Sequence, residues 1–287
     1  MSEQPLVLVT GATGNTGAGV VTGLRSLGWP VRAASRHPDG RDGAEPVTFD
    51  WTRPETFAPA LRDVERIYLV APVGVATPEK LVRPFFDLAV QAGVRRVVLL
   101  SSSAVAEGDP ALGQLHQLVR KVFPEWTVLR PSWFMQNFVG SHPVADAVRA
   151  TSRIVTATGD GKVGFIDAAD ISAVAVAALT RDEALNTDLV LTGPQSLSYP
   201  EVAAVLSEAA GRTIEHVDVT AEELARLLTE AGYEAVFSAA LASLDDQIRA
   251  GSEAAVSPVV EELTGRAPRA FGDFVRAHRD RLAPVTA

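Results

Sequence analysis

The chain has 287 residues, of which 47% are hydrophobic and 21% charged, a composition typical of a folded globular protein. Its formal net charge is −9, and an acidic chain lacks the basic surface that nucleic-acid binding requires. Because it contains no cysteine, disulfides, thiolate zinc sites and cysteine nucleophiles are excluded.

The first residues contain no basic segment leading into a long apolar run, so a secretory signal is not expected. The longest apolar stretches fall far short of the roughly 18 residues that a membrane-spanning helix needs. We therefore expect a cytoplasmic protein with no membrane and no nucleic-acid partner.

Short β-branched runs alternate with amphipathic segments through the first half of the chain. Helical spacing of apolar residues is clear in 78–92 and 110–122. Buried strands separated by helices are typical of a parallel sheet covered on both faces, so we expect an α/β, Rossmann-type doubly wound sheet. The predicted strands are 6–10, 31–35, 47–49, 67–71, 94–101 and 127–129.

The second half has a looser pattern, with a helix expected at 169–179 and strands at 188–191 and 213–219. Ser198 and Thr220 each stand three residues before a glutamate, which is the spacing of a capping box and predicts a helix start at both sites. We divide the chain into a nucleotide-binding core, 1–155, and the remainder, 156–287. The second part supplies the last core elements and a smaller C-terminal α/β lobe that binds substrate.

The strongest local signal is a buried strand that runs into a glycine-rich turn and then a helix. Its glycines have separate tasks: Gly11 turns the chain, Gly14 admits a diphosphate and Gly17 lets the helix pack on the sheet. The helix N-terminus directs free N–H groups and partial positive charge at the phosphates. The whole turn is predicted to bind a dinucleotide, through Gly11, Thr13, Gly14, Asn15, Thr16 and Gly17.

The end of the second predicted strand selects the cofactor. Enzymes that use NAD usually place a carboxylate there to bind the ribose, whereas this chain has Ser35 and Arg36. A guanidinium and a hydroxyl can both bind a 2′-phosphate, which favours NADP(H) over NAD(H). Arg36 as an ordinary solvated residue is the alternative.

Two further loops are expected to line the nucleotide. Asp50 and Trp51 follow the third strand, where they can contact the adenine or serve only as a loop carboxylate and a packed indole. Ala71 and Pro72 end the fourth strand, where small residues let the backbone approach the nicotinamide ribose.

Several catalytic motifs are missing. The chain has three tyrosines and three lysines, and no lysine follows a tyrosine at the spacing of a Tyr-x-x-x-Lys pair. There is no Gly-x-Ser-x-Gly elbow, no Walker lysine and no His-Glu-x-x-His, and the five histidines are scattered, so no metal site is expected.

Four motifs together resemble the NmrA-like atypical short-chain dehydrogenases. They begin at Gly11, Leu129, Gly159 and Thr264, and the last reads Thr-Gly-Arg-Ala-Pro-Arg-Ala-Phe-Gly-Asp-Phe. Within that group, the run Gly-Gln-Leu-His at 113–116 is most similar to bacterial relatives of the ergot-alkaloid reductases, the festuclavine and agroclavine synthases. The resemblance covers almost the whole chain.

The resemblance implies a Rossmann core that binds NADPH and a small lobe that closes over a small-molecule substrate of secondary metabolism. Ergot-alkaloid reductases deliver hydride to a carbon–nitrogen double bond and also lack the tyrosine–lysine pair. An iminium is already cationic and needs no general acid, which suits such a site. Carbonyl, quinone and enone substrates stay open. So do two alternatives: a non-catalytic NADP(H) sensor and an enzyme that uses bound NADP for a non-redox step.

Candidate substrate-side residues follow a strand at the carboxyl edge of the sheet. Trp133, Phe134 and Asn137 lie there, with the start of a packed helix as the alternative, and Tyr233 is a candidate from the lobe. His116 and Ser102 are the candidate catalytic groups, because His116 is the histidine expected nearest the nicotinamide and Ser102 belongs to a serine run that ends the fifth strand. A monomer or a homodimer is expected.

Overall fold

The computed structural model describes residues 4–72, 74, 75 and 77–284. Met1–Glu3, on which the expectation of no secretory signal partly rests, and Val73, next to the predicted ribose contact, lie outside the described residues. The described chain forms two compact units, both discontinuous in sequence. The first comprises 1–131, 168–191 and 259–266, and the second 132–167, 192–258 and 267–287, so the boundary expected after residue 155 falls inside the second unit.

The first unit is built on a seven-stranded sheet in the order β3-β2-β1-β4-β5-β6-β9, in which every neighbouring pair is parallel. The expected Rossmann-type doubly wound sheet is therefore confirmed. The strands are β1 (Leu6–Thr10), β2 (Val31–Ser35), β3 (Glu45–Thr48), β4 (Val64–Val70), β5 (Arg96–Leu100), β6 (Glu125–Pro131) and β9 (Thr187–Leu191).

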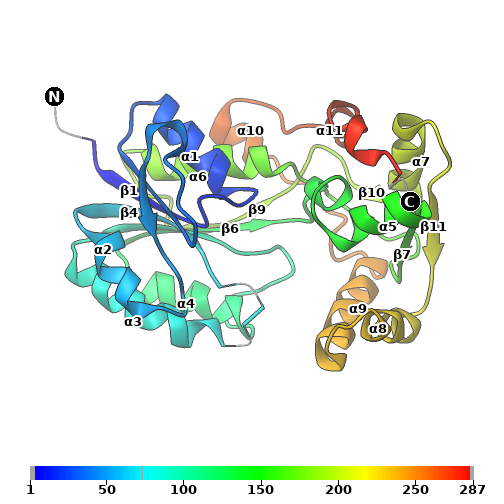
Figure 1. Ribbon diagram of the computed structural model, residues 1–287, viewed down its shortest axis with the longest axis horizontal. Coiled ribbons are helices and arrows are strands. Elements are labelled where there is room, and N and C mark those ends of the chain that lie inside the picture. The colour runs from blue at the N-terminus through cyan, green and yellow to red at the C-terminus, as the bar shows by residue number, and fades with distance from the viewer. Residues whose placement is uncertain (1–3, 73, 76, 285–287) are drawn as a thin grey trace. The chain divides into compact units, whose positions relative to one another are not determined.

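Helices cover both faces of this sheet (Figure 1). On one face lie α1 (Gly17–Ser26), α6 (Ala168–Thr180) and α10 (Val259–Thr264); on the other lie α2 (Phe57–Leu61), α3 (Pro78–Gln91) and α4 (Leu112–Val122). Short 3₁₀ turns occur at Arg41–Gly43 and Pro54–Thr56. The inner strands are mostly buried because both faces are covered, and all five residues of β2 are buried, whereas the edge strands β3 and β9 are more exposed.

The core between the sheet and α2–α4 contains an aromatic cluster. Phe49, Trp51, Phe57 and Phe85 pack with ring centroids 4.8–5.9 Å apart, mostly edge to face. Phe49 and Trp51 follow β3, and Phe57 and Phe85 lie on α2 and α3. The cluster fixes the loop after β3, which carries Asp50 and Trp51.

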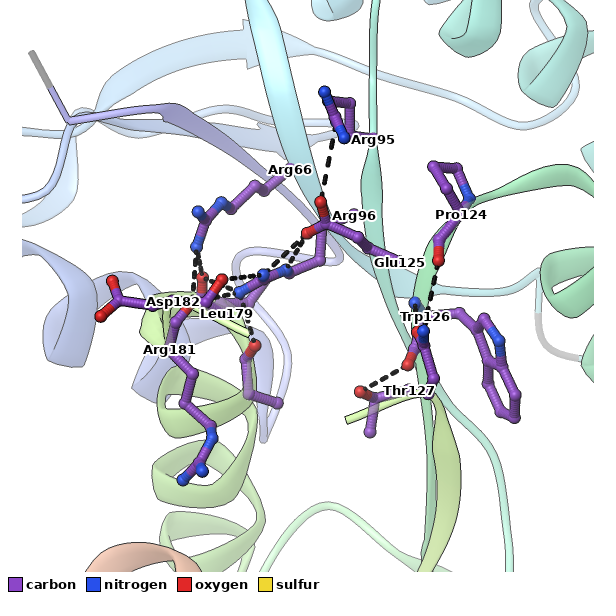
Figure 2. Close-up of polar contacts among 12 residues, drawn as sticks. Arg66, Arg95, Arg96, Pro124, Glu125, Trp126, Thr127, Leu179, Arg181 and Asp182 are labelled. Carbon is purple, nitrogen blue, oxygen red and sulfur yellow. Dashed lines mark hydrogen bonds and ion pairs between the residues drawn. The ribbon is translucent and has the colours of Figure 1, made fainter. Parts of the chain in front are cut away.

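At the amino edge of the sheet, the side chain of Arg96, on β5, binds backbone carbonyls at the C-terminal end of α6 (Figure 2). Its side chain is 2% exposed, its Nε donates to Glu125 at 2.7 Å, and its Nη atoms donate to the carbonyls of Arg181 at 2.5 Å and Asp182 at 3.0 Å. Arg66 donates to the neighbouring carbonyl of Leu179. The last carbonyls of a helix lack internal partners, so these guanidinium groups satisfy them.

The second unit has its own core and two small two-stranded sheets, a parallel pair, β7–β11, and an antiparallel pair, β8–β10. Its strands are β7 (Arg153–Thr156), β8 (Lys162–Val163), β10 (Leu197–Ser198) and β11 (Glu215–Asp218). Its helices are α5 (Pro143–Thr151), α7 (Tyr199–Ala210), α8 (Ala221–Glu230), α9 (Ala235–Arg249) and α11 (Phe271–Ala277), with 3₁₀ turns at Met135–Phe138 and Arg279–Leu282.

The two predicted helix starts are present. Ser198 forms the complete capping box with Glu201 at the start of α7. Thr220 accepts from the backbone N–H of Glu223 at the start of α8. Within the described ranges, no helix combines the length and the apolar character needed to cross a bilayer.

Candidate functional site

The glycine turn connects β1 to α1 in the first unit. Gly11 has a φ of +61°, which glycine adopts without strain, and its carbonyl accepts from the N–H of Gly14 at 2.9 Å. A Cβ on Gly17 would lie 2.1 Å from the carbonyl oxygen of Gly11. The tight turn therefore requires glycine at both ends.

The N-terminus of α1 is prepared for an anion. No side chain caps this helix at Thr16, and its first turn holds no acidic residue. The first N–H groups of a helix lack internal partners and carry partial positive charge, so a diphosphate can bind there. The side chains of Thr13 and Asn15 are exposed beside this turn.

Two buried hydroxyl groups, one from β4 and one from α6, form hydrogen bonds to the turn at Thr16. The Tyr68 hydroxyl, on β4, donates to Oγ1 of Thr16 at 2.9 Å. Oγ of Ser172, on α6, donates to the carbonyl of Thr16 at 2.8 Å. Burial raises the pKa of Tyr68 well above its usual range, so this phenol stays protonated and serves as a donor.

Sequence reasoning missed both anchors. The run of apolar residues around Tyr68 predicts that it is buried, but no local pattern predicts that its hydroxyl binds Thr16, 52 residues away. Ser172 lies 156 residues from Thr16 along the chain. Only the folded sheet and its covering helix bring these three elements together.

The carboxyl end of β2 carries Ser35 and Arg36, as the sequence indicates. Oγ of Ser35 is buried and has no hydrogen-bond partner within the described part of the chain. Arg36 is exposed and forms no ion pair with any described residue. A buried hydroxyl without a partner costs free energy, and a 2′-phosphate would supply the acceptor, so these residues fit NADP(H).

Asp50 and Trp51 lie in the loop after β3. Oδ1 of Asp50 accepts from the backbone N–H of Thr52 at 2.9 Å and from its hydroxyl at 2.8 Å. The backbone hydrogen bond is the main reason that the pKa of Asp50 is lowered, so the group is a carboxylate at neutral pH. Trp51 packs on the aromatic cluster and remains partly exposed.

The next two strands end in small residues and hydroxyl groups. Ala71 is buried and Pro72 partly buried directly after β4. After β5, Nε2 of His116 lies 2.5 Å from Oγ of Ser101, and both side chains are buried. Ser102 is more exposed, and its Oγ accepts from the N–H of Ala104 at 3.3 Å. His116 is therefore paired with the serine that precedes the one predicted from the sequence.

The predicted substrate-side residues lie in the second unit. Trp133 and Phe134 are half-buried, and the backbone of Phe134 bridges Ile166. Asn137 lies one turn later in the 3₁₀ helix, so the structure groups these three residues. Tyr233 lies elsewhere, between α8 and α9, with its ring 6.0 Å from that of Phe237.

A buried carboxylate supports this turn. Oδ1 of Asp167 accepts from Nε2 of Gln136 at 2.7 Å, and its Oδ2 pairs with Nη1 of Arg269 at 3.1 Å. The backbone N–H of Met135 donates to the carbonyl of Ile166 at 2.9 Å, and that of Ile166 to the carbonyl of Trp133 at 3.0 Å. The segment that carries Trp133 and Phe134 is therefore held by both polar and backbone bonds.

The doubly wound sheet and the glycine turn after β1 are features of nucleotide-binding α/β proteins. The model of the NmrA-like family matches residues 3–275, and the chain belongs to this family. The predicted family is therefore confirmed.

Known proteins are similar over almost the whole length. The chain is 45% identical to the uncharacterized oxidoreductase YesF of Bacillus subtilis, covering 97% of this chain and 96% of YesF. It is 39% identical to the agroclavine dehydrogenase of Claviceps fusiformis, covering 96% and 97% respectively. The structure of the Escherichia coli quinone oxidoreductase QOR2 complexed with NADPH is similar, with a TM-score of 0.79 at 21% identity, covering 94% of this chain and 99% of that one.

Proposed function

We propose that this protein is an NADPH-dependent reductase that transfers hydride to a small metabolite with a C=N, C=O or activated C=C bond. The observation that carries the proposal is the carboxyl end of β2. Among the described residues, the hydroxyl of Ser35 has no hydrogen-bond partner and the guanidinium of Arg36 has no ion-pair partner. Neither of these two positions holds an acidic residue. Relatives at 45% and 39% identity are named as an oxidoreductase and a dehydrogenase, which supports the reaction class.

The protein binds two charged groups of the cofactor, the diphosphate and the 2′-phosphate. The turn from Gly11 to Gly17 and the first N–H groups of α1 bind the diphosphate, and Ser35 and Arg36 bind the 2′-phosphate. When bound, NADPH supplies the hydride. The protein's task is then to orient the dinucleotide along the carboxyl edge of the sheet, where ligands bind in open α/β folds.

Among these substrates, the sequence favours a cationic C=N bond. No tyrosine–lysine pair is present in the sequence, and Tyr68, the tyrosine nearest the turn, is fixed as a donor to Thr16. A cationic C=N bond accepts hydride without an acid, which makes it the simplest substrate for such a site. We assign Trp133, Phe134, Asn137 and Tyr233 to the substrate side, and Asp50, Trp51, Ala71 and Pro72 to the nucleotide side.

The test compares two coenzymes on one variant. Arg36→Ala should weaken NADPH binding about 10- to 100-fold, the worth of a charge-assisted hydrogen bond, and change NADH binding little. Arg83→Ala is the matched control, because Arg83 is an exposed arginine on α3, away from β2. Calorimetric titration with each coenzyme measures both affinities. Equal losses for NADPH and NADH, or no binding of either coenzyme to the wild type, would overturn the proposal.

A further inference from the structure

Ser101 and His116 form a buried pair at the carboxyl edge of the first unit's sheet. Ser101 is the first residue after β5, and its N–H donates to the carbonyl of Leu129 at 2.7 Å, which fixes its backbone against β6. His116 lies in the second turn of α4, the helix that follows β5. Nε2 of His116 and Oγ of Ser101 are 2.5 Å apart, and the residues are 4% and 8% exposed.

The pair lies at the edge of the sheet where ligands bind in open α/β folds. In the sheet, β5 is the neighbour of β4, and β4 is the neighbour of β1, which leads into the glycine turn. The strand order reverses direction between β1 and β4, and ligands of open α/β sheets bind outside the carboxyl ends at such a point. Ser101 therefore lies one strand beyond the reversal, on the same edge as the phosphate-binding turn.

The surroundings of His116 set its protonation. Burial is the main reason that its pKa is lowered, and the charge of Arg130 on β6 lowers it further. Asp188 on β9 and Glu107 and Asp109 in the loop before α4 act in the opposite direction and are weaker. Nη1 of Arg130 pairs with Asp188 at 2.8 Å, and its Nη2 donates to the carbonyl of Ser103 at 3.1 Å, so the cation is fixed near the imidazole.

In this position the imidazolium form of His116 is a stronger acid than an exposed imidazolium, and Oγ of Ser101 can accept its proton. The cationic ring is disfavoured by burial and by Arg130, so it gives up its Nε2 proton readily. The hydrogen bond directs that proton to Oγ of Ser101, the side chain that the ring contacts at Nε2. A serine hydroxyl both donates and accepts, so it can pass one proton on while it takes another.

We propose that Ser101 donates a proton to the heteroatom of neutral substrates and that His116 replaces that proton on Ser101. This inference rests on the reductase function proposed above. The substrate carbon accepts hydride from NADPH and forms a C–H bond, and the electron pair of its C=O or C=N bond moves to the heteroatom. That atom takes the Ser101 proton, Ser101 takes the Nε2 proton of the imidazolium, and the neutral imidazole is reprotonated by water. NADPH leaves as NADP⁺. Ser101 is the catalytic residue, and His116 acts through it.

Two probes of similar size separate this role from a structural one. Isatin is a neutral activated ketone that needs a proton together with the hydride. The N-methyl-3,4-dihydroisoquinolinium ion is a permanent iminium that needs hydride alone. For the wild type, kcat with isatin should fall as the pH rises above the lowered pKa of His116, because the imidazolium is lost. With the iminium, kcat should not follow that titration.

His116→Gln and Ser101→Ala should each lower kcat with isatin about 100-fold or more, the usual worth of general acid catalysis, and remove the pH dependence. Both variants should reduce the iminium within about threefold of the wild-type rate, which also shows that they fold. Gln114→Ala, an exposed position on the same helix, is the control and should leave both rates unchanged.

Equal losses on both probes would show a structural role and overturn the inference, as would unchanged isatin rates in both variants. A wild-type protein that reduces the iminium but not isatin would overturn it too, while leaving the reductase proposal intact. If neither probe oxidises NADPH, both the reductase function and this inference fail.

Discussion

The hydroxyl of Tyr68 donates a hydrogen bond of 2.9 Å to Oγ1 of Thr16, the N-cap residue directly before α1. The bond is buried and joins β4 to the phosphate-binding turn across 52 residues of sequence. A turn that is held in place before the ligand arrives loses less entropy on binding. We therefore expect Tyr68 to contribute to nucleotide affinity through Thr16.

Tyr68→Phe removes this bond and little else. We expect a loss of about 1 kcal/mol in the free energy of unfolding, the usual worth of a neutral hydrogen bond, and a loss of NADPH affinity of about fivefold. Urea unfolding and fluorescence titration measure the two effects. Tyr199→Phe is the control, because Tyr199 is a buried tyrosine of the second unit. Unchanged NADPH affinity in Tyr68→Phe would contradict the anchoring role.

Gly17 cannot be replaced by alanine without movement of the turn. The new Cβ would lie 2.1 Å from the carbonyl oxygen of Gly11, and that oxygen belongs to the backbone and cannot rotate away. Gly17→Ala should therefore lower NADPH affinity at least about 100-fold and also reduce stability, since overpacking costs about 1–3 kcal/mol. In Gly40→Ala, the control, the nearest atom to a Cβ is 4.0 Å away. Wild-type affinity in Gly17→Ala would show that the turn does not bind the diphosphate.

The sequence predicts those features whose cause is local. The glycine turn, the parallel sheet and the capping box at Ser198 all follow from neighbouring residues, and each is present. At Thr220 the same spacing gives the bond from the hydroxyl to the Glu223 N–H. The strands expected at 6–10 and 31–35 have the predicted bounds. Most other expected bounds differ from the observed ones by a few residues, because helix and strand ends depend on tertiary contacts.

The rest depends on contacts between distant segments. His116 is a candidate from its helix alone, but its partner is Ser101, and the sequence offers three adjacent serines without distinguishing them. The division into units is equally hidden, because α6, β9 and α10 return to the first unit after the chain has entered the second. Short-range sequence patterns do not indicate to which unit a later segment belongs.

Arg96 tests how much the amino edge of the sheet depends on one buried cation. Its guanidinium donates to Glu125 and to the carbonyls of Arg181 and Asp182, the two residues that follow α6 (Figure 2). Arg96→Leu leaves those carbonyls and the partly exposed Glu125 without this donor. Loss of one partner of a fully buried pair costs about 3–5 kcal/mol, and we take the lower end of that range because Glu125 is partly exposed. We expect a loss of this order in the free energy of unfolding, measured with urea.

Arg95 provides the matched comparison. Its side chain is 70% exposed and lies 3.7 Å from the same Glu125. An exposed ion pair contributes little, so Arg95→Gln should change the free energy of unfolding by less than about 1 kcal/mol. Similar losses in the free energy of unfolding for the Arg96 and Arg95 variants would refute the stabilising role of Arg96 at the end of α6.

Asp245 makes the stability of the protein depend on pH. Its Oδ2 accepts from the N–H of Ala157 at 2.9 Å within the second unit. Burial raises the pKa of Asp245 from its ordinary 3.8 to about 6, although the hydrogen bond and Arg249 act in the opposite direction. The folded state thus binds a proton more tightly than the unfolded state does. The contribution to stability is complete below the unfolded pKa and is lost as the pH rises through about 6.

Asp245→Asn should remove this dependence, because the amide oxygen can still accept from Ala157 but carries no charge. We expect the variant to exceed the wild type in free energy of unfolding by about 1–3 kcal/mol at pH 8 and to differ little near pH 3. Asp246→Asn, at the exposed neighbouring position, should shift the wild-type pH profile only slightly, because the charge of Asp246 is the weakest of the influences that raise the pKa of Asp245. Urea unfolding between pH 3 and pH 8 measures all three proteins. If the wild type instead gains stability from Asp245 as the pH rises from 4 to 6, the fold stabilises the charged carboxylate and the expected sign is wrong.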